Sequence, residues 1–392
     1  MKIVIIATYF GTQKPWYFEY FLHTAINNSS IDFIFFTDLP NVPQSSNFKC
    51  INLSLADFRD KLNSKLGGIL KFTNPMKLCD IRTSYGESLE EYLINYDFWG
   101  YCDIDVILGN LRNFFTDELL KKYDILFTKA EYPSGFFALF KNTSKINILY
   151  KSTRDYNAIF SSEKPLMFDE CGGAYEEVCN GIDILKTATP FDSLHHILAR
   201  NQDFKTLYEF LSIEGNPGRM RYVNGILSYN QEYEILLYHL TNFKDNFFTY
   251  KHFAPRIFEN LVIARLSIGQ DNSYNRLKFI CRDLFKPKFW KLAVNVDMFL
   301  TRFFKVNFKK KILPGEYQYM NHRVVVEEKS NQLYLLYNGL HSCKLTILMF
   351  HKNIFFEHQS KTFFNMADES PNGYNSFYAI SPFESPRKFT KV

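Results

Sequence analysis

The chain has 392 residues, of which 46% are hydrophobic and 18% aromatic, so it can bury a large core and is not expected to be disordered. Its net charge of +5 is concentrated in one segment, 276–311, which contains eleven Lys and Arg but two Asp. Seven Cys at irregular spacing, with no Cys-x-x-Cys, argue against a disulfide framework and a structural zinc site. We expect reduced thiols, a cytoplasmic location and no membrane span, because no stretch approaches the roughly 18 apolar residues that crossing a bilayer requires.

The N-terminal part of the chain predicts alternating strands and helices. Residues 2–10 form an apolar, β-branched run, which is typical of a strand buried on both faces. We expect further strands at 31–37, 98–108, 124–129 and 135–140, and helices at 16–27 and 78–95. This alternation predicts an α/β fold with a mostly parallel sheet flanked by helices. Ligands of such sheets bind beyond the carboxyl ends of the strands.

The character of the chain changes after about residue 250. Residues 288–305 predict an amphipathic helix, in which Phe289 and Leu292 share an apolar face. From residue 323, short β-rich runs are separated by turn residues, which predicts a small β-rich region. We therefore divide the chain into a main domain at 1–254, a basic amphipathic helical segment at 255–315 and a small β-rich C-terminal region at 316–392.

The most informative motif is FWGYCDIDVILG at 98–109, where Asp103 and Asp105 stand two residues apart at the end of an apolar run. In an extended chain, side chains at i and i+2 point the same way. The pair can therefore bind one hard divalent cation and leave its other side for waters and phosphate oxygens. The alternative is a strand-end pair that caps a turn.

Companion motifs occur in order along the chain: KLCD at 77–80, YDFWGYCDIDVILGNL at 96–111, GFFALF at 135–140, FDE at 168–170 and YHLTNFK at 238–244. The series resembles a GT-A (Rossmann-like) glycosyltransferase of the bacterial type found in capsule and lipopolysaccharide gene clusters. It is more distantly similar to the glycogenin-like retaining galactosyltransferases. The resemblance covers roughly residues 1–250, so it identifies the main domain as a nucleotide-sugar-binding catalytic domain.

The resemblance implies that Asp103 and Asp105 bind Mn²⁺ or Mg²⁺, with Asp105 as the firmer ligand. His239 corresponds to a late histidine that completes the metal site, and an imidazole suits Mn²⁺ better than Mg²⁺. The alternative is a packed core histidine in an apolar run. Lys244 corresponds to a lysine that clamps the diphosphate. It stands five residues after the histidine rather than six, and no glycine lies between them.

The resemblance also implies contacts with the nucleotide. Asp38 corresponds to a carboxylate that accepts a hydrogen bond from the base or ribose. Ala7, Thr8 and Tyr9 end the first predicted strand, where nucleotide contacts usually lie. Lys77 corresponds to a basic residue that approaches the donor from the helix before the Asp-x-Asp strand. A solvated helix lysine is the alternative.

Asp169 and Glu170 correspond to the place where the acceptor and the reacting sugar meet. A Glu there can deprotonate an acceptor hydroxyl in inverting transfer, or it can orient the donor in a retaining reaction. The sequence leaves the stereochemistry open. The alternative is an acidic pair at a helix N-terminus, favoured by the helix dipole.

These observations predict a metal-dependent glycosyltransferase that transfers a sugar from a UDP-linked donor to a cell-surface polysaccharide or lipid-linked glycan. The alternative is a catalytically inactive nucleotide- or carbohydrate-binding protein of the same fold. A nucleotidyltransferase is disfavoured, because residues 9–12 are too poor in glycine for a phosphate loop.

The basic segment leaves three interpretations open: a solvated helical face, contact with an anionic membrane surface, or nucleic acid binding. Nucleic acid is disfavoured, because no recognised binding motif accompanies the charge. Membrane contact would place the protein peripherally on the inner face of the cytoplasmic membrane.

Overall fold

A computed structural model of the chain describes residues 1–209, 211–246, 248–251 and 260–304, and from residue 315 onward the strands of the C-terminal region. The chain divides into two compact units. The first is formed mainly by Met1–Glu214 and Met220–Leu240. The second is formed mainly by Thr241–Lys251 and Val262–Val392, together with the short segment Gly215–Arg219.

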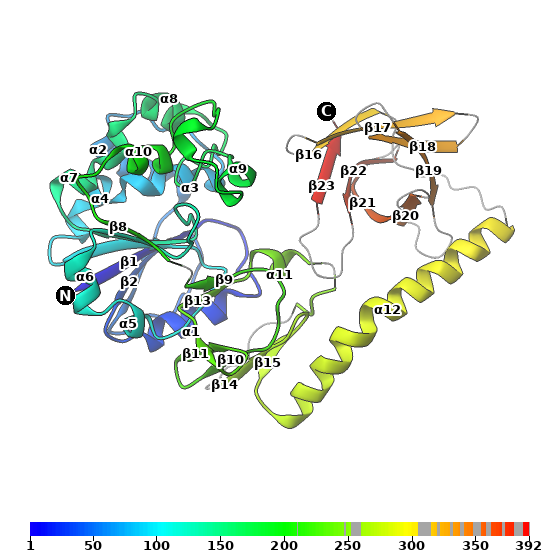
Figure 1. Cartoon of the computed structure of the whole chain (residues 1–392), viewed down its shortest axis with the longest axis horizontal. Helices are drawn as coiled ribbons and strands as arrows, with labels where there is room; N and C mark the ends of the chain where they lie inside the picture. Colours follow the sequence, from blue (N-terminus) through cyan, green and yellow to red (C-terminus); the bar gives the residue numbers. More distant parts are fainter. Residues whose placement is uncertain are drawn as a thin grey trace. The chain divides into compact units, whose positions relative to one another are not determined.

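A seven-stranded sheet with the order β3-β2-β1-β4-β7-β6-β8 forms the centre of the first unit (Figure 1). Its strands are β1 (Ile3–Tyr9), β2 (Asp32–Thr37), β3 (Phe48–Asn52), β4 (Phe98–Cys102), β6 (Ile125–Phe127), β7 (Phe137–Lys141) and β8 (Thr206–Tyr208). β7 runs antiparallel to its neighbours β4 and β6, and the other pairs are parallel. The predicted fold class, an α/β fold with a mostly parallel sheet, is confirmed.

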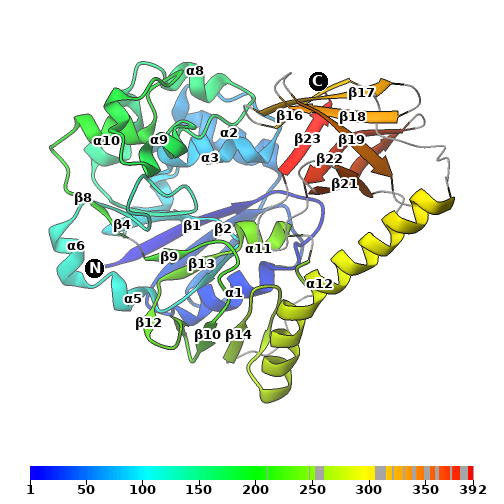
Figure 2. The same ribbon diagram turned by 45° about the vertical axis from the view of Figure 1, so that its right-hand side comes forward.

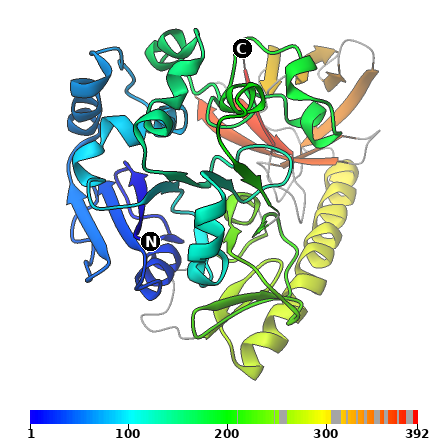
Figure 3. The same cartoon turned by 60° about the vertical axis from the view of Figure 1, so that its left-hand side comes forward.

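Helices cover both faces of this sheet, and apolar side chains alternate between the two cores. Along β1, Val4 and Ile6 contribute to one core, whereas Ile3, Ile5 and Ala7 contribute to the other. The first core is closed by α2 (Leu55–Leu66), α3 (Leu78–Ile81), α4 (Tyr85–Ser88), α7 (Ser144–Asn147), α8 (Tyr156–Ser161) and α10 (Leu194–Arg200). The second is closed by α1 (Phe18–Asn27), α5 (Leu111–Phe114) and α6 (Asp117–Lys122) (Figures 1 and 3).

The segment predicted as one helix at 78–95 is a series of short turns. α3 is followed by the 3₁₀ turn Arg82–Ser84, then by α4 and by a second 3₁₀ turn at Glu90–Tyr92. Gly86 lies where this segment meets the sheet, and a Cβ atom there would come within 2.8 Å of the indole of Trp99. The glycine therefore lets the buried indole pack directly against the helical backbone.

The strand predicted at 98–108 is interrupted, and this part of the prediction is wrong. β4 ends at Cys102, and β5 (Val106–Leu108) joins a different, three-stranded sheet with the order β5-β13-β9. In that sheet β13 (Leu237–His239) pairs antiparallel with β5 and parallel with β9 (Ser212–Ile213). The Asp-x-Asp pair therefore lies in the turn between two sheets and not within a strand.

The rest of the first unit includes a helix and a β-meander. The helix α9 (Tyr175–Cys179) follows the turn that holds Asp169 and Glu170. β10 (Met220–Val223), β11 (Ile226–Tyr229) and β12 (Tyr233–Glu234) pair antiparallel in sequence order.

The second unit contains α11 (Thr241–Asp245), β14, which spans the boundary (Asn260–Ile263), β15 (Ile268–Gln270) and the long helix α12 (Ser273–Phe304) (Figure 2). α12 begins earlier than predicted, and Lys305 lies outside the described residues. The predicted β-rich region is a closed antiparallel sheet of eight strands: β16 (Gly315–Tyr319), β17 (His322–Lys329), β18 (Gln332–Tyr337), β19 (His341–Ile347), β20 (Ile354–Glu357), β21 (Thr362–Ser370), β22 (Gly373–Ala379) and β23 (Arg387–Lys391). Within the described part of the chain, every helix is too short or too polar to span a bilayer.

Candidate functional site

Asp103 and Asp105 lie in the turn that follows β4, at the carboxyl end of this strand. The backbone N–H of Asp103 donates to the carbonyl of Phe136 at 2.9 Å, and the backbone N–H of Leu240 donates to the carbonyl of Asp105 at 2.7 Å. These bonds tie the turn to the residue before β7 and to the residue after β13. Both carboxylates therefore project from a fixed backbone at the edge of the sheet where α/β folds bind ligands.

His239, the last residue of β13, completes a cluster of three ligating side chains. One ligand atom from each of Asp103, Asp105 and His239 lies within 4.8 Å of the other two. The Nε2 atom of His239 is 3.3 Å from Oδ2 of Asp105. Asp105 and His239 are buried and Asp103 is half-buried, so the cluster is accessible on the Asp103 side. Two carboxylates and one imidazole fit a divalent transition metal ion.

A further carboxylate holds the imidazole from its other nitrogen. The Nδ1 atom of His239 is 2.9 Å from Oε1 of Glu214, and Oε2 of Glu214 is 2.7 Å from the ammonium nitrogen of Lys129. A carboxylate on one ring nitrogen fixes the orientation of the ring and leaves the other nitrogen for a metal ion. Lys129 and Glu214 therefore position His239 with Nε2 directed toward Asp105.

The charges around His239 shift the pKa values of this group. Burial disfavours the imidazolium of His239, but the carboxylates of Asp105 and Glu214 outweigh burial and raise its pKa to about 9. Burial likewise disfavours ionised Glu214, yet the hydrogen bond with His239 and the charge of Lys129 lower its pKa below the usual range. His239 is thus protonated at neutral pH, and a metal ion that binds Nε2 must displace this proton.

An aromatic ring covers the face of the imidazole. The rings of Phe136 and His239 stack with their centroids 4.3 Å apart and their planes 28° apart. The ammonium of Lys129 lies 5.7 Å from the centroid of the same Phe136 ring. This packing restricts rotation of the imidazole, so His239 is both a packed residue and a candidate ligand.

Arg82 connects the metal-binding candidates to the second acidic pair. Its Nη1 atom is 2.8 Å from Oδ1 of Asp103, and its Nε atom is 3.3 Å from Oδ2 of Asp169. The same Nη1 also donates to the carbonyl of Gly135. The side chain of Arg82 is only 8% exposed, so the structure holds a buried cation between the two acidic pairs.

Asp169 and Glu170 lie in a turn before α9, so they are not at a helix N-terminus. Asp169 is 1% exposed, and its Oδ1 atom has no hydrogen-bond partner among the described residues. Glu170 accepts hydrogen bonds from the backbone of Gly135, at 3.1 Å, and from the hydroxyl of Tyr175. Burial raises the pKa of Asp169 well above its usual range, against the opposing charge of Arg82.

Gly135 allows both of these carboxylates to approach the backbone. A Cβ atom at this position would lie 2.7 Å from Oε1 of Glu170 and 2.8 Å from Oδ2 of Asp169. Such distances are far below van der Waals contact, so a side chain at position 135 would displace the acidic pair.

The predicted nucleotide contacts lie at the same edge of the sheet. Ala7, Thr8 and Tyr9 end β1, which pairs in parallel with both β2 and β4. Asp38 follows β2, is exposed, and accepts a hydrogen bond from the backbone N–H of Gly11 at 2.9 Å. Their role in binding a nucleotide stays a prediction.

Lys77 is neither solvated nor directed toward the carboxylates of the site. Its side chain is 0% exposed, and its ammonium donates to Asp80 at 2.7 Å and to the carbonyls of Ile159 at 2.6 Å and Lys164 at 2.9 Å. Three acceptors engage its three hydrogens, so this placement gives Lys77 a structural role. Arg82, five residues later, is the cation that reaches Asp103.

The Lys77–Asp80 pair fixes the loop that leads to Asp169. Asp80 accepts hydrogen bonds from the backbone N–H groups of Leu166, at 2.9 Å, and Phe168, at 2.8 Å. Both oxygens of Asp80 are therefore used to hold the backbone immediately before the acidic pair.

Lys244 lies in α11, which belongs to the second unit, whereas the cluster around His239 belongs to the first. Its predicted role as a clamp for the diphosphate stays a prediction.

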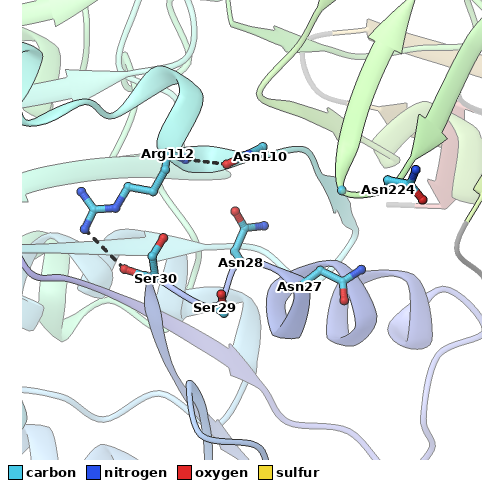
Figure 4. Close-up of a pocket in the computed structure, with 8 residues that line it drawn as sticks. Asn27, Asn28, Ser29, Ser30, Asn110, Arg112 and Asn224 are labelled. Carbon is cyan, nitrogen blue, oxygen red and sulfur yellow. Dashed lines mark hydrogen bonds between the residues drawn. The ribbon is translucent and has the colours of Figure 1, made fainter.

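A separate polar pocket of about 240 Å³ lies near the end of α1 (Figure 4). It is lined by Asn27, Asn28, Ser29, Ser30, Asn110, Arg112, Asn224 and Gly225. The amide nitrogen of Asn28 donates to the carbonyls of Thr24 and Gly109, and Arg112 donates to the carbonyl of Ser30. These side chains hold loops together, so we do not assign a ligand to this pocket.

Sequence reasoning missed three charged residues of the site, namely Arg82, Glu214 and Lys129. Arg82 lies in the segment from which a basic residue was expected, so its position was a usable signal. Glu214 and Lys129 follow other strands and carry no local pattern, because only the tertiary fold brings them to His239.

The chain belongs to a family described as "Family of unknown function (DUF6625)", which matches residues 5–274. No curated protein matches the chain.

Several solved structures of glycosyltransferases are distantly similar to the chain. The galactosyltransferase LgtC, in complex with donor and acceptor sugar analogs, is 13% identical over 54% of this chain and 75% of its own, with a TM-score of 0.26. Mouse xyloside xylosyltransferase 1, in its apo form, is 8% identical over 61% of this chain and 97% of its own, with a TM-score of 0.32. The glycosyltransferase GlyE of Streptococcus pneumoniae TIGR4 is 11% identical over 53% of this chain and 45% of its own, with a TM-score of 0.24. Because these TM-scores are low, the fold is defined by the strand order described above and not by these similarities.

Proposed function

We propose that the protein is a metal-dependent glycosyltransferase, which moves a sugar from a nucleotide donor to an acceptor hydroxyl. The main support is the convergence of Asp103, Asp105 and His239 within 4.8 Å of one another, next to the carboxyl ends of the parallel strands. A divalent ion bound by these residues would neutralise the diphosphate that leaves during transfer. The imidazole of His239 favours Mn²⁺ over Mg²⁺, which prefers oxygen ligands.

The donor side of this proposal uses the ends of β1 and β2. Ala7, Thr8, Tyr9 and Asp38 offer backbone and side-chain groups for a nucleoside beside the metal-binding cluster. We propose UDP as the nucleotide, as the resemblance of the sequence motifs implies. We retain Lys244 in this proposal as a cation for the leaving diphosphate.

The acceptor side of the proposal uses Asp169 and Glu170. The backbone N–H of Gly135 and the hydroxyl of Tyr175 both donate to Glu170, which fixes its carboxylate in one orientation. A fixed carboxylate next to a donor site can take a proton from an acceptor hydroxyl. The unpartnered, buried oxygen of Asp169 is a second group to which a sugar hydroxyl can bond. We propose a cell-surface polysaccharide or a lipid-linked glycan as the acceptor.

Calorimetry with UDP, in the presence and absence of Mn²⁺, tests the proposal. We expect metal-dependent UDP binding that is lost in Asp105→Ala and kept in the control Asp60→Ala, whose carboxylate is exposed in α2. A screen of nucleotide sugars for metal-dependent hydrolysis would identify the donor. UDP binding that ignores Mn²⁺, together with no hydrolysis, would identify a catalytically inactive nucleotide-binding protein instead.

A further inference from the structure

The two faces of α12 have opposite environments within the second unit. Phe279 is 4% exposed and packs so closely on Gly269 that a Cβ atom there would lie 2.9 Å from the phenyl ring. One turn later, the carboxylate of Asp283 accepts the backbone N–H groups of Arg265, at 2.9 Å, and Leu266, at 3.0 Å. Phe279 thus attaches one face of the helix to β15, and Asp283 attaches it to the turn between β14 and β15.

The opposite face of α12 is apolar and exposed. Six large apolar side chains on this face are between 48% and 65% exposed: Leu277, Ile280, Leu284, Phe285, Phe289 and Leu292. Leu277, Ile280 and Leu284 follow one another at three or four residues, as do Phe285, Phe289 and Leu292, so the six form two adjoining rows on the side of the helix away from Phe279. Single exposed apolar residues are ordinary, but a continuous stripe of this size marks an interaction surface.

Cations border this apolar stripe. Arg276, Lys278 and Lys288 are exposed, and Arg282 and Lys286 are half-buried, within the same turns of the helix. Arg276 is paired with Asp271, and the carboxylate of Asp283 accepts backbone N–H groups on the attached face, so Lys278 and Lys288 carry the exposed positive charge of the outer face. The outer surface of the helix is therefore both apolar and positively charged.

We propose that the exposed face of α12 lies on an anionic lipid bilayer, with the helix parallel to the membrane plane. Apolar side chains with bordering lysines and arginines bind at such an interface, because the rings and branched chains enter the acyl boundary while the cations contact the headgroups. Charge complementarity decides between this partner and a second copy of the chain. Two copies joined through this face would bring like charges together, whereas acidic headgroups would neutralise them.

Sedimentation of the full chain with vesicles tests the proposal. We expect binding to vesicles that contain phosphatidylglycerol, much weaker binding to phosphatidylcholine alone, and a loss of binding as salt rises from about 0.1 M to about 1 M, where the screening length falls from about 10 Å to about 3 Å. The proposal is independent of sugar transfer, because no donor or acceptor enters the measurement.

Matched variants separate the charged from the apolar contribution. Lys278→Gln, Lys286→Gln and Lys288→Gln combined should weaken binding roughly a hundredfold, since each cation near an anionic surface contributes about fivefold. The control combines Lys121→Gln, Lys122→Gln and Lys145→Gln, three exposed lysines of the first unit, and should change binding by no more than about twofold.

The apolar contribution has its own matched pair. Leu277→Ser, Leu284→Ser and Phe289→Ser combined should abolish binding at every salt concentration. Ile94→Ser, Ile148→Ser and Ile182→Ser remove apolar side chains of the first unit that are also exposed, between 44% and 78%, and should leave binding unchanged. All replaced side chains are exposed, so the variants are expected to fold.

A polarity-sensitive fluorophore on the free cysteines reports which face meets the lipid. Cys281 is exposed and one residue from Ile280, whereas Cys179 is exposed in α9 of the first unit. The spectral response to vesicles should persist after labelling of Cys179→Ser and disappear in Cys281→Ser.

Three outcomes would overturn the proposal. The first is a wild-type protein that ignores anionic vesicles at low salt. The second is a loss of binding that is equal in the variants and in their controls. The third is a concentration-dependent dimer that the three serine substitutions dissociate, because this would show that a second copy covers the stripe.

Discussion

Two buried clusters of opposite charges lie on neighbouring turns of the first unit, and they differ in how completely their polar atoms are paired. In the first, Lys77 and Asp80 are both 0% exposed, and backbone groups use the remaining hydrogens and oxygens of the pair. In the second, Arg82 contacts Asp103 and Asp169, but Asp103 is 36% exposed and one oxygen of Asp169 has no hydrogen-bond partner among the described residues.

This difference in pairing indicates that the Lys77–Asp80 pair is structural, whereas the Arg82 cluster is part of a candidate binding site. A buried charge is costly unless it is fully hydrogen-bonded, and the Lys77–Asp80 pair meets that condition without any ligand. The Arg82 cluster does not meet it, and one of its members, Asp103, is also a metal-binding candidate. Incomplete pairing in an otherwise well-packed protein is the pattern expected where a ligand completes the network.

The largest effect should come from Asp105→Ala in the open cluster. Transfer should fall more than about a thousandfold, equivalent to more than about 4 kcal/mol, because the divalent ion loses its most buried carboxylate. Metal-dependent UDP binding should disappear in calorimetry while the melting temperature changes little. A variant that keeps full activity would contradict the assignment of the metal site.

Lys77→Met should instead act on stability. It leaves the carboxylate of Asp80 buried without its cation, which costs about 3–5 kcal/mol of unfolding free energy. Urea denaturation measures this loss, and the double variant with Asp80→Asn should recover part of it, because it removes the uncompensated charge and keeps one oxygen as an acceptor for the backbone N–H groups of Leu166 and Phe168. A loss below about 1 kcal/mol would show that the closed pair is not scaffolding, and the comparison above would fail.

Glu170→Gln should lower turnover about a hundredfold with little change in donor affinity, because a proton acceptor acts mainly in the transition state. Steady-state kinetics with calorimetry of UDP binding distinguish the two parameters. Glu177→Gln, an exposed position in α9, is the control. Unchanged turnover would exclude Glu170 as the base.

The pKa of His239, raised to about 9, predicts that Mn²⁺ affinity depends on pH. The imidazolium cannot bind a metal, so protons compete with Mn²⁺ below pH 9. Affinity should therefore rise about tenfold per pH unit from pH 6.5 to 8.5 and level off near 9. Titrations across this range should show the slope in the wild type, and His239→Gln should remove it. A flat profile in the wild type would mean that Nε2 does not ligate the metal.

The smallest effect is expected for Glu214→Gln, which touches the metal site only through His239. Mn²⁺ affinity should fall at least about tenfold, as for other carboxylates that orient a ligating histidine. The loss of a negative charge should also lower the pKa of His239, so the plateau of the pH profile should move to lower pH. Equal affinity and an unshifted profile would assign Glu214 to packing alone.

The sequence predicted the strands of the sheet well where each strand is one apolar run. β1, β2 and β6 are buried on both faces, and such strands leave a continuous signal. The same rule failed at 98–108, because β4 and β5 are both fully buried and the break between them falls at Asp103–Asp105. Because both strands are buried and apolar, the hydrophobicity pattern does not show that the chain passes from one sheet to another.

The candidate site was predicted where a motif is local and missed where it is not. The Asp-x-Asp pair could be recognised from neighbouring residues, and His239 from its place in a series of motifs. Lys129 and Glu214 contact this cluster only through tertiary structure, and no periodicity marks them. Lys77 was predicted because the resemblance matched it to a basic residue before the Asp-x-Asp strand, and sequence position does not show that Arg82, five residues later, is the cation that reaches Asp103.

The position of β13 has a consequence for the order of assembly during synthesis. All seven strands of the main sheet, through β8 at Thr206–Tyr208, leave the ribosome before His239. The small sheet β5-β13-β9 joins Asp105 to His239 across a long stretch of chain, and long-range pairing of this kind closes late in folding. A nascent chain thus presents the two carboxylates before His239 is available, so the three-residue cluster is complete only after β13 has paired with β5.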